Sequence, residues 1–78
     1  MTSDQLFYMS LLYSDGSWTR KDAVHARACN ALGVQAAKSA RAEVLACEWV
    51  EITKESVRAT HDGMCAVWHR ARELAIIK

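Results

Sequence analysis

Residues 44–60 read VLACEWVEITKESVRAT, and the spacing of the apolar side chains changes within this stretch. Before residue 48 the apolar residues recur at helical intervals. After it they alternate, so that Val50 and Ile52 share one side of an extended chain, and the alternation resumes after the polar pair Lys54-Glu55. Two β-branched runs joined by a short polar turn predict a β-hairpin over residues 49–60.

The sequence before this hairpin predicts three helices. The first covers about residues 3–14, because Thr2 and Gln5 have the spacing of a capping box. The second begins after Thr19 as its N-cap and ends at Gly33. The third runs from about Gln35 to Cys47, and its predicted apolar face consists of Ala36, Ala40, Val44 and Cys47.

A last helix is predicted from about Asp62, with Val67, Leu74 and Ile77 near one face. The fold class is therefore mainly α with a short β-hairpin, in a single domain over residues 1–78. Leu45 and Trp49 stand at the junction of the third helix and the hairpin, and we expect both side chains to be largely buried.

The composition excludes several classes of protein. Of the 78 residues, 51% are hydrophobic and 24% are charged, which is typical of a globular domain and not of a disordered chain. The sequence contains neither an apolar run of about 18 residues for a membrane span nor the basic and apolar blocks of a secretory signal. We expect a cytoplasmic protein that has no membrane partner.

The three cysteines, Cys29, Cys47 and Cys65, are an odd number, whereas a secreted domain of this size usually has paired ones. We expect them to be reduced, buried and free of metal. A zinc site is the alternative, because His25 and Cys29 lie four residues apart, as do Cys65 and His69. The four side chains would meet if the second and last helices came together.

Charge is unevenly distributed along the chain. Residues 20–41 contain five basic residues and one acidic residue, whereas residues 42–62 contain two basic and five acidic residues. Such an asymmetry can mark the surface that binds a charged partner.

The order helix, helix, glycine turn, helix, hairpin, helix resembles the winged helix-turn-helix superfamily over nearly the whole chain. Residues 20–47 correspond to the helix-turn-helix and residues 49–60 to the wing. The matching motifs are the small and apolar residues around the turn glycine, Ala28, Cys29, Leu32, Gly33 and Val34; the step into the wing, Glu48-Trp49-Val50-Glu51; and the entry into the closing helix, Ala59-Thr60-His61-Asp62-Gly63, which resembles a Leu-Thr-x-x-Gly signal.

The resemblance implies a module that binds double-stranded DNA, in a small transcriptional regulator similar to those of phages and mobile elements. Phosphate contacts are expected at the start of the second helix and base contacts at the start of the third. The residues expected to contact DNA are Thr19, Arg20, Lys21, Gln35, Lys38, Arg41, Lys54 and Arg58.

Two departures from the family pattern leave a second function open. Ala36, Ala37 and Ala40 occupy positions that often touch DNA, where alanine reads little beyond a thymine methyl group, and Ser39 replaces a usual core residue. Glutamates also flank the wing. These features favour a small phage-type inhibitor that binds and blocks a host protein, as anti-CRISPR proteins do.

Such an inhibitor would use aromatic anchors such as Tyr8 and Tyr13. The many apolar residues of the terminal helices also predict a homodimer formed through them. The sequence lacks a glycine-rich nucleophile elbow and clustered acids, so we expect neither an enzyme nor a cofactor.

Overall fold

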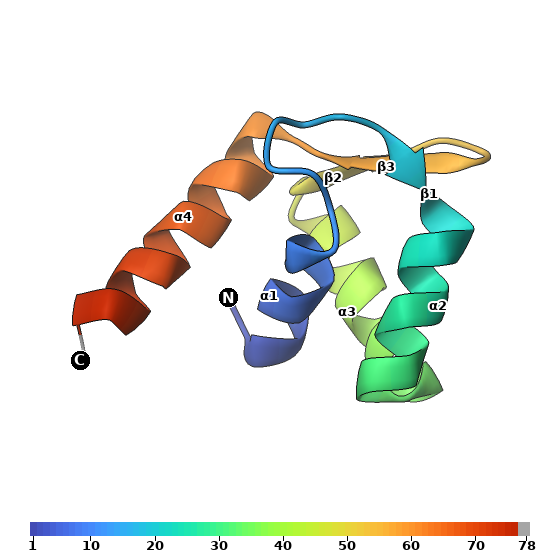
Figure 1. Ribbon diagram of the computed structural model, residues 1–78, viewed down its shortest axis with the longest axis horizontal. Helices are drawn as coiled ribbons and strands as arrows, with labels where there is room; N and C mark the ends of the chain where they lie inside the picture. The colour runs from blue at the N-terminus through green and yellow to red at the C-terminus, as the bar shows by residue number, and fades with distance from the viewer. Residues whose placement is uncertain (77–78) are drawn as a thin grey trace.

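The computed structural model describes residues 1–76. This part of the chain forms four helices and a three-stranded antiparallel sheet with the strand order β1-β3-β2 (Figure 1). The elements in chain order are α1 (Ser3–Ser10), β1 (Thr19–Arg20), α2 (Lys21–Leu32), α3 (Val34–Ala46), β2 (Val50–Ile52), β3 (Ser56–Ala59) and α4 (His61–Ile76). The predicted hairpin is confirmed as β2 and β3. Ile77, expected on the apolar face of the last helix, lies outside the described residues.

Helix α1 begins with the predicted capping box. The hydroxyl of Thr2 accepts a hydrogen bond of 3.1 Å from the N–H of Gln5, and the Gln5 side chain accepts one of 3.0 Å from the N–H of Thr2. The helix ends at Ser10, four residues earlier than predicted. The following loop turns at Gly16, which has a φ of 80° that glycine adopts without steric cost.

Strand β1 was not predicted, and it changes the start of α2. Thr19 is not the N-cap: it pairs with Val57 in the sheet, and Arg20 is the cap residue without a side-chain hydrogen bond. The N–H of Lys21 instead donates to the carbonyl oxygen of Glu55 at 3.1 Å. A strand of two residues is too short to show an alternation of apolar and polar side chains in the sequence. At the start of α2, the backbone of the hairpin accepts the hydrogen bond that a capping side chain would otherwise accept.

Gly33 separates α2 from α3 with a φ of 91°, as its predicted place in the turn requires. The predicted apolar face of α3 is confirmed at Ala40 and Val44 and wrong at its ends. Cys47 is exposed and Ala36 is only half-buried, whereas Ala37 is buried, so the helix is turned slightly from the predicted orientation. Five of the thirteen residues of this helix are alanine, so its sequence gives little contrast in hydrophobicity between the two sides. Ser39, at the expected core position, faces solvent.

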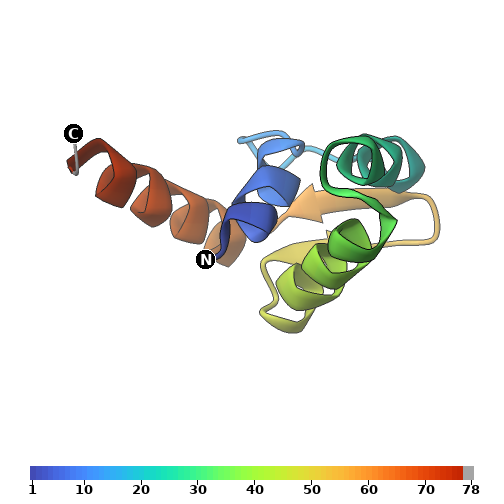
Figure 2. The same ribbon diagram turned by 90° about the horizontal axis from the view of Figure 1, so that it is seen from below.

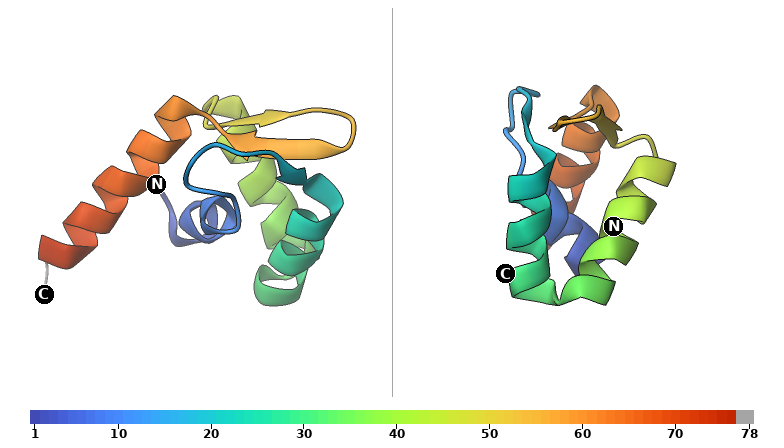
Figure 3. Two further views of the ribbon diagram at one scale, coloured as in Figure 1. Left: turned by 45° about the horizontal axis from the view of Figure 1, so that its top comes forward. Right: turned by 90° about the vertical axis from the view of Figure 1, so that its right-hand side faces the viewer.

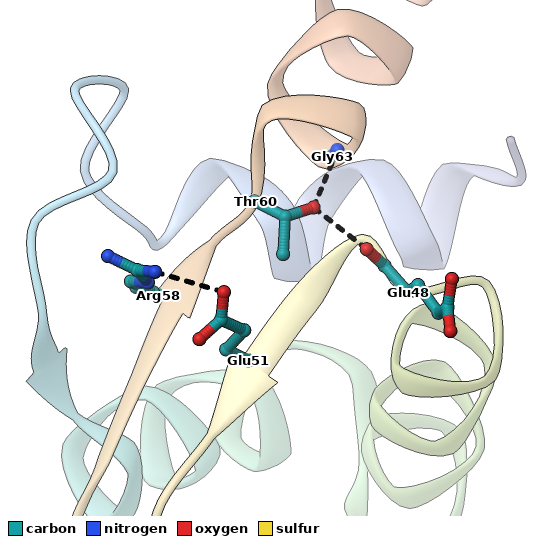
Figure 4. Close-up of polar contacts among 5 residues, drawn as sticks. All are labelled: Glu48, Glu51, Arg58, Thr60 and Gly63. Carbon is teal, nitrogen blue, oxygen red and sulfur yellow. Dashed lines mark hydrogen bonds and ion pairs between the residues drawn. The ribbon is translucent and has the colours of Figure 1, made fainter.

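The junction between hairpin and α4 is built around Thr60 (Figure 4). Its hydroxyl donates to the carbonyl oxygen of Glu48 at 2.8 Å and accepts from the N–H of Gly63 at 3.0 Å. The N–H of Thr60 donates to the carbonyl oxygen of Trp49 at 3.0 Å. The threonine and glycine of the Ala59–Gly63 motif thus cap α4 and join it to the end of α3.

The prediction that Leu45 and Trp49 are largely buried is wrong. The surface of Leu45 is 47% exposed, and Trp49 is only half-buried. The chain turns at Glu48, whose φ is 60°. At this junction the carbonyl group of Trp49, and not its ring, packs against Gly63.

Helices α1, α2 and α3 lie beneath the sheet, and α4 runs away from them (Figures 1 and 3). The buried core between these elements consists of Tyr8, Met9, Leu12, Val24, Ala28, Ala37, Ala40, Val44, Val50, Val57 and Ala59. Figure 2 shows α4 extending beyond the rest of the molecule. Within residues 1–76, every helix falls short of the length and apolar content needed to cross a membrane.

Candidate nucleic-acid interface

Four of the predicted DNA contacts lie where the hairpin meets the start of α2, and one of them, Thr19, pairs with Val57 in the sheet. Arg20 pairs with Ser56 in the sheet, Lys21 begins α2 beside Glu55, and Lys54 is exposed in the turn between β2 and β3. Figure 1 shows this turn above the beginning of α2. We call Arg20, Lys21 and Lys54 the wing corner. Its excess of positive charge is reduced by Glu55.

Gln35 and Lys38 lie on the first turns of α3, and both side chains are exposed. The charge of Lys38 also acts on His25, in the first half of α2. The predicted DNA contacts therefore come from two groups on different elements, the wing corner and the start of α3.

The outward face of α3 differs from the one that the sequence indicated. Ala37 and Ala40 are 0% and 1% exposed, so they pack in the core and cannot reach DNA. Ser39 and Ala42 are exposed instead, beside Gln35. The spacing of Gln35, Ser39 and Ala42 is that of one helical face, which the sequence could have revealed only with the correct rotation of α3.

Arg41 is half-buried on α3, and its positive charge influences the pKa values of Tyr8 on α1 and His25 on α2. Burial raises the pKa of Tyr8, and the positive charge of Arg41 opposes this. The pKa of His25 is lowered by burial first and then by Arg41 and Lys38, an effect that Asp22 offsets in part. The packed pair α2 and α3 therefore carries a net positive potential near His25.

Arg58 is engaged by its neighbours. Its guanidinium donates to the carboxylate of Glu51 at 2.9 Å, an ion pair across β2 and β3 (Figure 4). The same group lies 4.8 Å from the ring centroid of Trp18. The other ion pair in residues 1–76 joins Arg70 to Glu73. The basic side chains of residues 20–41 thus take part in neither of the two ion pairs of the described chain.

The predicted zinc ligands do not converge, because α2 and α4 lie on opposite sides of the molecule (Figure 1). Cys65 approaches His61 rather than His69, with 3.6 Å between Sγ and Nε2. Cys29 lies 3.5 Å from His25. No three metal-binding side chains come together anywhere in residues 1–76.

The predicted burial of the cysteines is wrong for two of them. Cys47 and Cys65 are exposed, and Cys29 is half-buried. Cys47 follows the last turn of α3 as its C-cap, and Cys65 lies on a part of α4 that the core does not cover.

An apolar groove of about 630 Å³ runs between α1 and α4. Its lining includes Tyr13 and Trp68, which are 59% and 57% exposed. Tyr8 is not available as the predicted anchor for a partner, because it is 0% exposed and its ring lies in the core. The predicted partner surface therefore retains Tyr13 and loses Tyr8.

No protein family, no curated protein and no solved structure matches the chain.

Proposed function

We propose that this chain is a winged helix-turn-helix domain that binds double-stranded DNA and serves as a small transcriptional regulator. In this proposal α2 and α3 form the helix-turn-helix, the hairpin of β2 and β3 forms the wing, and α4 is the closing helix. The order of the elements supports it, as does the turn at Gly33, which lets α3 pack beside α2.

The observation that carries the proposal is the set of basic side chains on residues 20–41 that lack acidic partners. Arg20, Arg27 and Lys38 are exposed, and Lys21 and Arg41 are half-exposed. Neither ion pair of the described chain involves them. Unpaired cations on neighbouring elements suit phosphate binding, because each phosphate contact releases a counterion from the DNA.

The arrangement of the two basic groups is also compatible with a duplex. The major groove is about 12 Å wide and admits an α-helix. With α3 in the groove, Lys38 and the wing corner can contact the phosphates on either side. Ser39 and Ala42 are small, so the helix can approach the bases, and Gln35 can form paired hydrogen bonds with adenine.

Fluorescence anisotropy with a random-sequence duplex at low salt tests the proposal. We expect binding at micromolar concentrations or tighter, since even nonspecific DNA binders reach about 10⁻⁴–10⁻⁶ M at physiological salt. Lys38→Ala should weaken this binding. Arg72→Ala is the matched control, because it removes one charge from an exposed site on α4. Lack of binding at tens of micromolar, or equal losses in both variants, would contradict the proposal.

One observation favours the alternative, in which the protein binds and blocks another protein. Val34 and Leu45 are 58% and 47% exposed at the two ends of a stripe on α3 that also contains Lys38 and Arg41. Apolar side chains around a cation are typical of a protein interface, where a few buried anchors supply most of the binding energy.

The two functions respond differently to changes on this stripe. Leu45→Ser should leave nonspecific DNA binding unchanged within twofold, because leucine contributes nothing to phosphate neutralisation. If the protein instead inhibits a protein partner, Leu45→Ser should impair that inhibition more than Lys38→Ala does. The pair of variants therefore separates a phosphate-binding face from a protein-binding one.

A further inference from the structure

We propose that His61 and Cys65 of α4 form one half of a tetrahedral zinc site, which the same two residues of a second copy of the chain complete. Both side chains are exposed, and Cys65 Sγ lies 3.6 Å from His61 Nε2. The site lies outside the proposed DNA interface and does not depend on it.

The separation of these two atoms equals one edge of a zinc tetrahedron. Zinc lies about 2.3 Å from a cysteine sulfur and about 2.0–2.1 Å from a histidine nitrogen, and at a tetrahedral angle these two ligands stand about 3.6 Å apart. The helix sets this spacing, because residues four apart are neighbours on one face. The helix therefore holds the two side chains at a spacing that one zinc ion can bridge.

The second histidine–cysteine pair of the chain is a poorer site for a cation. His25 Nε2 lies 3.5 Å from Cys29 Sγ, which is nearly the same geometry. This pair, however, is part-buried on α2, and Arg41 and Lys38 of the neighbouring helix α3 both act on His25. Their charge opposes a divalent ion. The pair on α4 has Asp62 as its neighbour in the chain and lies open to solvent.

Two ligands do not hold a zinc ion in a closed site, and residues 1–76 supply no third one nearby. The surroundings of His61 and Cys65 favour a second copy as the source of the others. Both line the apolar groove between α1 and α4, and α4 extends away from the core (Figure 2). Trp68 and Leu74, further along α4, are 57% and 43% exposed.

A twofold axis beside Cys65 would bring the same pair from each copy to one ion, since an isologous interface repeats every contact. The metal then has two sulfur and two nitrogen ligands. Each Cys65 thiol releases its proton to solvent when the metal binds. Two thiolates and two neutral imidazoles leave the complex without net charge, which suits burial in an apolar interface.

The test uses the whole reduced protein, freed of metal and titrated with Co²⁺ and then Zn²⁺. Absorption typical of tetrahedral cobalt with thiolate ligands reports the ligand set. Native mass spectrometry gives the stoichiometry, and sedimentation gives the mass with zinc and with a chelator. We expect one metal per two chains and a dimer that zinc supports. Cys65→Ser should weaken metal binding by more than about a hundredfold, the upper range for changes outside the ligand shell.

His61→Gln should have the same effect as Cys65→Ser. The matched controls are Cys29→Ser, in the other histidine–cysteine pair, and Cys47→Ser, an exposed cysteine without such a partner. Both should keep the cobalt spectrum and the dimer. Absence of the thiolate spectrum overturns the proposal, as does its retention in Cys65→Ser or its loss in Cys29→Ser. One metal bound per monomer overturns the second copy as the source of ligands.

Discussion

The hydroxyl of Thr60 lies 2.8 Å from the carbonyl oxygen of Glu48 and donates a hydrogen bond to it, although the two residues are twelve positions apart in the chain. The contact fastens the first residue after the hairpin to the turn before it. It also fixes the position of α4, because the same hydroxyl accepts from the N–H of Gly63. Substitutions of the residues next to this hydrogen bond should therefore change the stability of the packing between the hairpin and α4.

Replacing Glu48 by glycine should stabilise the protein. Glu48 has a φ of 60°, which costs an ordinary residue about 1–2 kcal/mol, and the added freedom of glycine in the unfolded chain costs about 0.4–1 kcal/mol. The net gain is therefore about 0.5–1 kcal/mol, measured by urea denaturation. The carbonyl group that binds Thr60 is retained. Glu55→Gly, at an exposed glutamate with ordinary φ, should destabilise instead.

Replacing Gly63 by alanine should destabilise the protein severely. An added Cβ would overlap the carbonyl oxygen of Trp49 and lie 2.9 Å from Cε of Met9. Because backbone cannot yield as a side chain does, we expect a loss of more than about 3 kcal/mol, beyond the usual range for overpacking. Helix propensity alone predicts the opposite sign, with alanine better by about 1 kcal/mol. Thermal unfolding of the variant decides between the two.

Gly33→Ala provides a comparison, because no atom lies within 4 Å of its added Cβ. The cost there is backbone strain alone, about 1–3 kcal/mol for a residue forced into a conformation natural to glycine. If Gly63→Ala lost less stability than Gly33→Ala, the close approach of α4 to the hairpin would be wrong.

Val44 and Leu45 are neighbours on α3 with opposite environments. Val44 is fully buried, so Val44→Ala should cost about 1–3 kcal/mol, in line with the burial of a valine side chain. Leu45 is 47% exposed, and Leu45→Ala should cost less than about 1 kcal/mol. Equal losses in urea denaturation would mean that the rotation of α3 differs from the one described.

This pair also shows which parts of the fold the sequence could predict. The hairpin, the capping box and the turn at Gly33 depend on local signals, namely alternation, a hydroxyl with a glutamine, and a positive φ. The rotation of α3 does not. Its alanines are apolar enough to be buried on either side, so the choice depends on packing against α1 and α2.

The candidate site also has features that the sequence predicts and features that depend on tertiary contacts. Its basic residues and their exposure followed from the charge pattern, since Arg20, Lys38 and Lys54 all face solvent. Their separation into two groups depends on the path of α2, and the pairing of Arg58 depends on the register of β2 and β3. Contacts between distant residues of this kind leave no periodic signal in the sequence.

The histidine on α2 should report the positive potential of its surroundings. Arg41 and Lys38 add to the effect of burial in lowering the pKa of His25. Arg41→Gln should therefore raise that pKa, as measured by NMR titration of the imidazole ring. Arg27→Gln removes a charge from α2, the helix of His25, but not one that acts on His25, and should leave the pKa of His25 unchanged. An unchanged titration in Arg41→Gln would refute this assignment.

The lowered pKa also sets the direction of a pH effect on stability. Because His25 binds its proton less readily in the folded state than in the unfolded one, where the pKa is about 6.5, its contribution is complete above that pH. It is lost as the pH falls through the lower folded-state pKa. His25→Gln should therefore reduce the loss of stability between neutral and mildly acidic pH, measured by thermal unfolding.

The last prediction concerns the two basic groups, the wing corner and the start of α3. If α3 lies in the major groove, Lys38 and Lys54 contact phosphates on different sides of it. Removing either should lower the slope of log affinity against log salt by about 0.9, the value for one neutralised phosphate. The effects of Lys38→Ala and Lys54→Ala should add in the double variant, since the residues lie on different elements and neither takes part in the two ion pairs of the described chain. A slope that changes with Lys38 alone would place the wing outside the DNA interface, and one that changes with Lys54 alone would mean that α3 does not enter the groove.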